Sequence, residues 1–164
     1  MTDKFAEFLK IASQLNKIGI VPLLMGSLGL EQVTGQDWQV RDIDIHVHGD
    51  ERGWEAPDEE RIYDMDKIEP MMERLGYCLV DLHEHEFQKE DLSIEFGVME
   101  TLEAFSGVPI AELTRKEVDG IEFLLPTAEQ FLAIYRASSQ DSYRNDNNNC
   151  KDFAKIAYLE KTIE

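Results

Sequence analysis

The sequence predicts an α+β fold, in which a small mixed β-sheet is flanked by helices and followed by a helical C-terminal part. Two observations support this prediction. In several long segments apolar residues recur at helical spacing, and between them lie shorter runs that are wholly apolar or alternate with polar residues. These segments follow one another as helix, strand, helix, strand, helix, two strands, hairpin and two helices, an order that indicates an α+β domain.

The N-terminal half is expected to alternate helices with strands. Thr2 and Ser27 are the expected N-caps of two helices, because their hydroxyls can accept hydrogen bonds from free backbone N–H groups. Gly35 is expected to end the second of these helices. The expected elements are a helix over Thr2–Lys17, a strand over Ile20–Met25, a brief helix over Leu28–Thr34, a strand over Gln39–Val47 and a loop over Gly49–Glu60.

The C-terminal half is expected to continue with strands and then helices. Asp66–Glu69 is close to a capping box, and Pro70 is expected in the first turn of that helix, where a missing N–H does little harm. Asp119-Gly120 suits the turn of a hairpin, and Thr127–Gln130 is a second capping box. The expected elements are a helix over Met65–Leu75, strands over Tyr77–Leu82 and Leu92–Val98 joined by a polar segment (His83–Asp91), a hairpin around Glu117–Phe123, a helix from Thr127, a polar break (Asp141–Asn149) and a helix over Cys150–Ile163 with Phe153, Ile156, Ala157 and Leu159 on its apolar face.

The most informative polar residues lie in and around the first two expected strands. Gly26 and Ser27 follow the first strand, and the second strand contains Asp42 and Asp44. Because side chains alternate along a strand, the two aspartates project from one face, about 7 Å apart at Cα, and can converge on one hard divalent cation. Gly26 leaves room for a phosphate to approach the backbone, and Ser27 can point its hydroxyl at the same group.

These residues resemble the signature of the nucleotidyltransferase superfamily, which includes DNA polymerase β-like enzymes, minimal nucleotidyltransferases and antibiotic nucleotidyltransferases. The resemblance rests on Gly26-Ser27, on Asp42-Ile43-Asp44-Ile45 and on an isolated acid in a later strand, Glu95, and it covers residues 18–98. Lys151-Asp152 also looks like the Lys-Asp-bearing helix that often ends small members. The resemblance implies one nucleotidyltransferase-like domain over residues 1–164, with a core over 1–125 and C-terminal helices over 126–164. The spacer between Ser27 and Asp42 is slightly longer than in most members.

The resemblance also implies a role for each site residue. Asp42 and Asp44 would bind the metal ions that hold the triphosphate, and Glu95 would be a third ligand or would position and deprotonate the acceptor hydroxyl. Gly26 and Ser27 would bind the phosphates of the nucleotide. Clustered carboxylates repel one another without a cation, so the site implies Mg²⁺ or Mn²⁺. Two such ions about 3.5–4 Å apart would stabilise both the attacking and the leaving oxygen.

The implied activity is transfer of a nucleoside monophosphate from an NTP, with ATP the first candidate, to a hydroxyl, with release of pyrophosphate. The acceptor would be a small hydroxylated compound or a protein partner, and the chain could form a homo-oligomer. The alternative is a catalytically degenerate nucleotide-binding or protein-interaction module of the same fold. This alternative stays open because the chain offers few cations for a triphosphate: Arg41, Arg52 and Lys89 are nearby in sequence, but none is assigned.

The acidic composition narrows the range of partners. The chain has 16 Lys plus Arg against 34 Asp plus Glu, a formal net charge of −18. Such a chain repels nucleic-acid phosphates and has no basic stripe for an anionic membrane. It also has no apolar run long enough to span a membrane and nothing that resembles a signal peptide, so a cytoplasmic location is expected. The isolated Cys78 and Cys150 are expected to be buried or half-buried thiols.

Four histidines offer a competing metal site. His46 and His48 share the acidic strand face, and His83 and His85 form a second alternating pair. Two such pairs could ligate zinc in a histidine-centred metallohydrolase. Hydrated surface histidines are the favoured interpretation, because neither a Cys nor a His-x₃-His spacing supports zinc.

Overall fold

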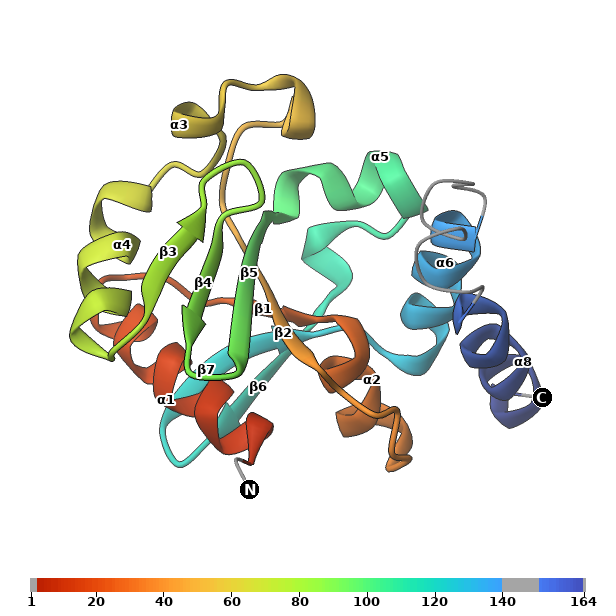
Figure 1. Cartoon of the computed structure of the whole chain (residues 1–164). Helices are drawn as coiled ribbons and strands as arrows, with labels where there is room; N and C mark the ends of the chain where they lie inside the picture. The colour runs from red at the N-terminus through yellow and green to blue at the C-terminus, as the bar shows by residue number, and fades with distance from the viewer. Residues whose placement is uncertain (1–2, 140–150, 164) are drawn as a thin grey trace.

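The computed structural model describes residues 3–139 and 151–163, which form a twisted seven-stranded sheet with helices on either side (Figure 1). The strands are β1 (Leu23–Met25), β2 (Asp42–Val47), β3 (Cys78–Asp81), β4 (Glu86–Lys89), β5 (Leu92–Val98), β6 (Thr114–Val118) and β7 (Ile121–Leu125). The α-helices are α1 (Lys4–Lys17), α2 (Gly26–Thr34), α3 (Asp58–Arg61), α4 (Met65–Arg74), α5 (Leu102–Ser106), α6 (Ala128–Ser139) and α8 (Lys151–Ile163). Short 3₁₀ turns lie at η1 (Gly53–Glu55), η2 (Met99–Thr101) and η3 (Ile110–Glu112).

The strands form one mixed sheet in the order β3-β4-β5-β2-β1-β7-β6, which confirms the predicted α+β class. β2 pairs parallel with β5, β1 pairs parallel with β7, and the other neighbours pair antiparallel. In Figure 1, α1 and α4 lie on the side of β3, whereas α6 and α8 pack together at the opposite end of the molecule. No helix in the described residues is long and apolar enough to cross a membrane.

β2 shows the alternation that the sequence predicts. Ile43, Ile45 and Val47 are buried in the core, while Asp42 is exposed and Asp44 and His46 are half-buried on the opposite face. The hairpin is also confirmed, because Asp119 and Gly120 take φ values of 52° and 80° between β6 and β7. The capping box at α6 forms as predicted: the Gln130 N–H donates to the Thr127 hydroxyl at 3.2 Å, and the Thr127 N–H donates to the Gln130 side chain at 2.8 Å.

The polar segment expected between β3 and β5 instead contains a further strand, β4. Its alternation is hard to recognise because Phe87 is the one completely buried apolar side chain among four residues. β4 pairs with β3 on one side and with β5 on the other, so it connects the outermost strand to the centre of the sheet. Two other unpredicted regions are the loop 49–60, which contains η1 and the start of α3, and the segment 99–112, which contains η2, α5 and η3.

Three predictions about helix starts are corrected. Asp3 is the N-cap of α1, accepting from the N–H groups of Phe5 and Ala6, and Thr2 lies outside the described residues. Ser27 does not cap α2, because that helix begins at Gly26, the residue before Ser27, and has no side-chain cap. Pro70 lies inside α4 rather than in its first turn, because that helix begins at Met65.

The inner face of α8 differs most from prediction. Phe153 is 50% exposed and Ala157 is also exposed, whereas the charged residues Asp152 and Lys155 are buried beside Leu159. Asp152 accepts a hydrogen bond of 2.7 Å from the Ser138 hydroxyl of α6, which explains how a buried carboxylate is tolerated between the two helices. The side chain of Lys151, the polar break over 141–149 and Cys150 lie outside what the structure describes.

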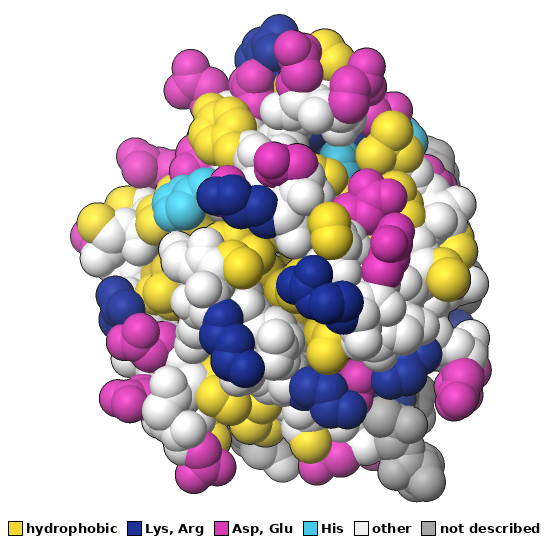
Figure 2. Space-filling view, turned by 90° about the vertical axis from the view of Figure 1, so that its left-hand side faces the viewer, with side chains coloured by type: hydrophobic (Ala, Val, Ile, Leu, Met, Phe, Trp, Pro, Cys, Tyr) yellow, Lys and Arg dark blue, Asp and Glu magenta, His cyan; other side chains and the backbone are white. Residues whose placement is uncertain are grey.

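The surface shows where the charge is placed. On the face over α1, α4 and β3, Lys and Arg side chains gather across the middle and acidic side chains occupy the top and the edges (Figure 2). The net charge of −18 is therefore unevenly spread over the surface. Cys78 lies exposed, contrary to the expectation of a buried thiol.

Candidate nucleotide-binding and catalytic site

The turn from β1 into α2 places Gly26 directly against the carboxylate of Asp44. Met25 pairs with Asp44 across β1 and β2, so the next residue turns the chain at the side of that aspartate. Gly26 has a φ of +66°, and a Cβ there would lie 3.0 Å from the Asp44 Cγ and closer still to its Oδ2. The position therefore requires glycine both for its left-handed backbone and for the close approach.

Replacing Gly26 by Ala is expected to destabilise the protein by about 1–3 kcal/mol beyond the cost of a left-handed Ala alone, because the methyl group must displace the Asp44 side chain. Gly35→Ala is the matched control, since Gly35 has a φ of +71° and a Cβ at that position would meet nothing within 4 Å. It is expected to cost only the backbone contribution, about 1–2 kcal/mol. Urea unfolding of both variants measures the difference, and equal losses of stability would contradict the close contact with Asp44.

The acids of the signature lie in a row on adjacent strands. β2 and β5 run parallel in a register that pairs Asp42 with Ser93 and Asp44 with Glu95. On the far side of β5, Glu95 pairs with Glu86 of β4, whose carboxylate accepts a 2.6 Å hydrogen bond from the Ser93 hydroxyl. The structure thus places Glu95 directly beside Asp44. A third acid must lie there if it acts on the same reacting group.

Burial and like charges change the protonation of this row. Burial, followed by the negative charges of Asp44 and Asp42, raises the pKa of Glu95 to about 7. Asp42 is exposed as a residue, yet partial burial of its carboxyl and the charge of Glu86 raise its pKa above the usual range, against the lowering effect of Arg41. A positive charge placed among these carboxylates would relieve the repulsion, which is the electrostatic property of a cation site.

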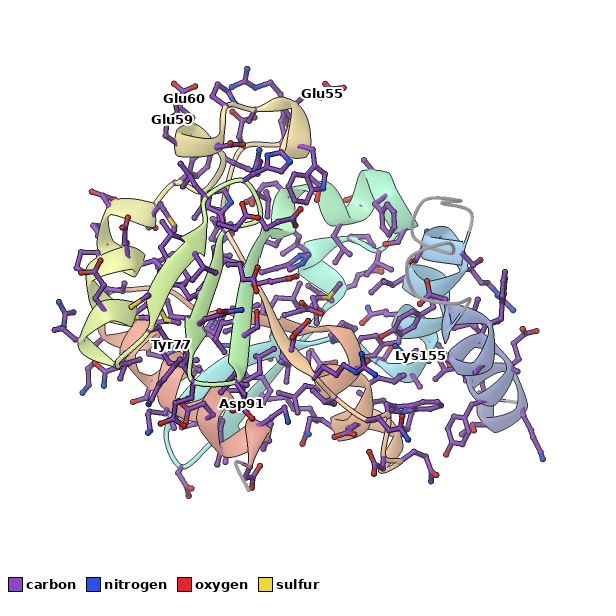
Figure 3. The ribbon with its side chains drawn as sticks, viewed as in Figure 1. Glu55, Glu59, Glu60, Tyr77, Asp91 and Lys155 are labelled. Carbon is purple, nitrogen blue, oxygen red and sulfur yellow. The ribbon has the colours of Figure 1, made fainter. Side chains whose placement is uncertain are left out.

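A pocket of about 350 Å³ adjoins this row of acids. It is lined by a lysine side chain that the sequence analysis did not identify, Lys155. Its lining includes Ser27, Asp42, Asp44 and Lys155. Lys155 reaches from α8 toward α2 (Figure 3), where its ammonium donates a 2.9 Å hydrogen bond to the Ser27 hydroxyl and lies 4.9 Å from the centre of the Tyr135 ring. Glu95 does not line this pocket; it lies on the neighbouring strand.

The lengthened segment between α2 and β2 forms another wall of the same pocket. Asp37, Trp38, Gln39 and Arg41 all line it. Trp38 is fixed in place: its backbone N–H donates to Glu31 at 2.7 Å, its indole N–H donates to Thr34 at 3.0 Å, and its ring packs edge-on against Tyr158 of α8. Arg52 and Lys89 are not part of this wall, because Arg52 pairs with Asp50 and Lys89 lies against Glu7.

The residues fit a magnesium ion that binds together with phosphate. Across residues 3–139 and 151–163, no three His, Cys, Asp or Glu side chains are gathered closely enough to hold a metal ion by themselves. Mg²⁺, however, is usually held by one or two carboxylates, with waters and substrate phosphates completing its shell. Asp42 and Asp44 line one pocket with Ser27 and Lys155, which suits such a shared arrangement.

The four histidines do not form a zinc site in the described residues. His48 is held by Glu100 at 2.5 Å, and His83 by Asp58 at 3.0 Å. His85 is buried rather than hydrated, with Nε2 3.0 Å from the carbonyl of Asp58, and burial lowers its pKa. Burial also lowers the pKa of His46 to about 4, and its Nδ1 has no hydrogen-bond partner among the described residues.

Comparisons with known proteins find similarity both in sequence and in structure. No protein-family model matches the chain. It is 40% identical over 162 residues to the "Uncharacterized protein YnaI" of Bacillus subtilis (strain 168), with 97% of each protein covered. The fold is similar to the solution structure of the antibiotic-resistance factor ANT(2'')-Ia, with a TM-score of 0.58 and 15% identity, covering 99% of this chain and 86% of that chain. This similarity to an antibiotic nucleotidyltransferase shows a nucleotidyltransferase-like fold.

Proposed function

Because the chain belongs to the family of the Bacillus subtilis protein YnaI and has a nucleotidyltransferase-like fold, we propose that it transfers a nucleoside monophosphate from an NTP to a hydroxyl group, with Mg²⁺ or Mn²⁺. ATP is the first candidate for the NTP. The observation that carries the proposal is the pocket in which Ser27 and Lys155 face Asp42 and Asp44, with Glu95 on the next strand. A cation, a hydroxyl and paired carboxylates are the groups that positioning and charge stabilisation of a triphosphate require.

Each residue has a distinct part in the proposed reaction. Asp42 and Asp44 would hold the metal, which would supply positive charge to the triphosphate and the leaving group. Ser27, Lys155 and the N-terminus of α2 bind the phosphates. The acceptor oxygen forms a bond to the α-phosphorus, the bond from that phosphorus to the bridging oxygen of the β-phosphate breaks, and pyrophosphate leaves. Glu95 takes the proton of the acceptor hydroxyl as the general base, a role that its place beside Asp44 on the next strand supports.

Titration of the wild-type protein with ATP, with and without Mg²⁺, tests the proposal. ATP is expected to bind and raise the melting temperature only with the metal, and EDTA is expected to reverse the shift, because two carboxylates and a triphosphate repel each other otherwise. Mg²⁺ alone is expected to bind weakly, since no three-residue cluster holds it in the described part of the chain. If Mg·NTP caused neither heat of binding nor a thermal shift, the proposal would be wrong.

The described residues contain no cluster of three side chains that could hold a metal ion by itself. This finding favours one alternative, a nucleotide-binding module without catalysis. In that case Mg·ATP binds at the Ser27–Lys155 pocket, but no hydroxyl acceptor causes pyrophosphate release. A screen of hydroxylated compounds and of proteins from cell extract, scored by pyrophosphate release, separates the two functions. Release that depends on Asp44 supports the enzyme.

A further inference from the structure

A second pocket, of about 530 Å³, lies farther along the same face of β2. Its floor is formed by His46 and Gly97, which pair with each other across β2 and β5, one strand step beyond the pair Asp44–Glu95. Two residues along a strand correspond to about 7 Å. The ring of His46 lies close against Gly97, since a Cβ there would be 2.7 Å from its Nε2. The second pocket therefore adjoins the catalytic row directly.

Along β2 the two pockets lie on opposite sides of the Asp44–Glu95 pair: Asp44 lines the first pocket, and the second begins at the next pair, His46–Gly97. The first is reached through Asp42 and contains Ser27 and Lys155, and the second is reached through His46. In an in-line displacement the attacking and the leaving oxygen lie on opposite sides of the phosphorus. Given the proposed function, on which this inference rests, pyrophosphate leaves toward Lys155. The attacking hydroxyl must then arrive from the side of His46.

The walls of the second pocket present aromatic surface. Trp54 of η1 is 62% exposed and Phe105 of α5 is 50% exposed, and both line the pocket. Trp54 is supported from one side by the guanidinium of Arg61, 4.7 Å from the ring centre. Arg61 in turn is buried and donates to the carbonyl groups of Gly53, Ala56 and His83. This network holds η1 in place, so the indole is a prearranged wall.

The charged groups of the second pocket are already paired or point away from it. Arg61 is bonded to Asp58 at 2.6 Å, and Arg52 is bonded to Asp50 at 2.7 Å. Glu55 also contributes to the lining, but Figure 3 shows it extending outward from η1 into solvent. These pairs leave little net charge to select an ionic ligand, whereas the aromatic rings favour a flat apolar group.

We propose that the second pocket binds the acceptor of the reaction, and that this acceptor is an uncharged alcohol with a flat apolar ring. The ring packs between Trp54 and Phe105. The hydroxyl crosses the floor at His46 and Gly97 to reach Glu95, which takes its proton as the oxygen bonds to the α-phosphorus. The product is a nucleoside monophosphate ester of the alcohol, and pyrophosphate leaves through the first pocket.

The test uses 2-(2-naphthyl)ethanol as the probe, with its charged analogue 2-(2-naphthyl)ethylamine for comparison. Both are titrated calorimetrically into the full-length protein with Mg²⁺ and α,β-methylene-ATP, which cannot be cleaved at the α-phosphorus. The alcohol is expected to bind at least about tenfold more tightly than the amine. Trp54→Ala and Phe105→Ala are each expected to weaken alcohol binding about tenfold and to leave the affinity for the ATP analogue unchanged. With Mg·ATP, mass spectrometry is expected to detect the AMP ester.

Tyr63→Ala is the matched control, because Tyr63 is also 62% exposed and follows the same loop but does not line the pocket. It is expected to leave alcohol binding unchanged. Absence of alcohol binding, equal binding by all four proteins, or tighter binding of the amine would overturn the inference. If the alcohol bound through Trp54 and Phe105 while the ATP analogue did not bind, the proposed function would fail and the acceptor role of the pocket with it. If the analogue bound and the alcohol did not, only the acceptor assignment would fail.

Discussion

Asp44→Asn is expected to reduce nucleotidyl transfer by at least about a thousandfold, or about 4 kcal/mol, without unfolding the protein. The neutral amide oxygen is a much weaker ligand for a divalent cation than a carboxylate, and Asp44 is central to the row, next to Gly26 and opposite Glu95. The fold should persist, because removing one of several neighbouring negative charges relieves repulsion in the metal-free protein. Pyrophosphate release and thermal melting measure the two effects separately.

The pH dependence of stability gives an independent readout of the same variant. The pKa of Glu95 is about 7 in the folded protein and 4.5 in the unfolded chain, so the folded protein holds this proton more tightly. The free energy of unfolding therefore falls as the pH rises from 4.5 to about 7. Since Asp44 contributes to the raised pKa of Glu95, Asp44→Asn is expected to reduce this fall in the metal-free protein. Asp91→Asn, in the exposed turn between β4 and β5, is the control and should change neither activity nor the pH profile. Full activity of Asp44→Asn would contradict the assignment.

Lys155→Met is expected to weaken binding of Mg·ATP and of Mg·pyrophosphate by about 10- to 100-fold, the value of a hydrogen bond to a charged group. Met keeps the aliphatic volume between α8 and Tyr135 and removes the ammonium that lies 2.9 Å from the Ser27 hydroxyl. Because pyrophosphate has no base or sugar, equal losses for both ligands would locate the effect at the phosphates. Titration calorimetry measures both affinities.

Two further variants test whether weaker binding by Lys155→Met reflects the lost charge or only a loss of packing. Lys161→Met removes an exposed charge from the last turn of the same helix and is expected to leave both affinities unchanged. Lys155→Arg retains the charge and is expected to bind more tightly than Lys155→Met. If Lys155→Met bound both ligands as the wild type does, Lys155 would be a structural residue and the triphosphate would need another cation.

The shared face of Asp42 and Asp44 could be predicted from sequence because it depends on local alternation, whereas the place of Glu95 beside Asp44 depends on the pairing of β2 with β5. Asp42 and Asp44 share a face once Ile43 and Ile45 are buried, and Glu95 lies in a strand whose own apolar residues define its register. The hairpin at Asp119-Gly120 was predictable for the same reason, since two residues with positive φ determine the turn. The mixed α+β class followed from the order of such segments.

Lys155 could not be found in this way, because α8 buries charged residues where its apolar periodicity predicts Phe153 and Ala157. Asp152 and Lys155 are buried against hydrogen-bond partners on other helices, Ser138 of α6 and Ser27 of α2, which lie 14 and 128 positions away. The one available signal was Lys151-Asp152, one turn earlier on the same helix. β4 was not predicted for a related reason. It is a strand because it pairs with both β3 and β5, and its own sequence offers one buried residue, Phe87.

The contact between Lys155 and Ser27 joins residues 128 positions apart in the chain. During synthesis the segments that carry Ser27 and the acids leave the ribosome well before α8, since the chain is made from its N-terminus. A nascent chain can therefore assemble the acidic row while the lysine that accompanies it is still being made. For that interval the ribosome-bound protein has carboxylates at the site without their lysine, and its affinity for nucleotide should rise by about 10- to 100-fold when the last helix docks.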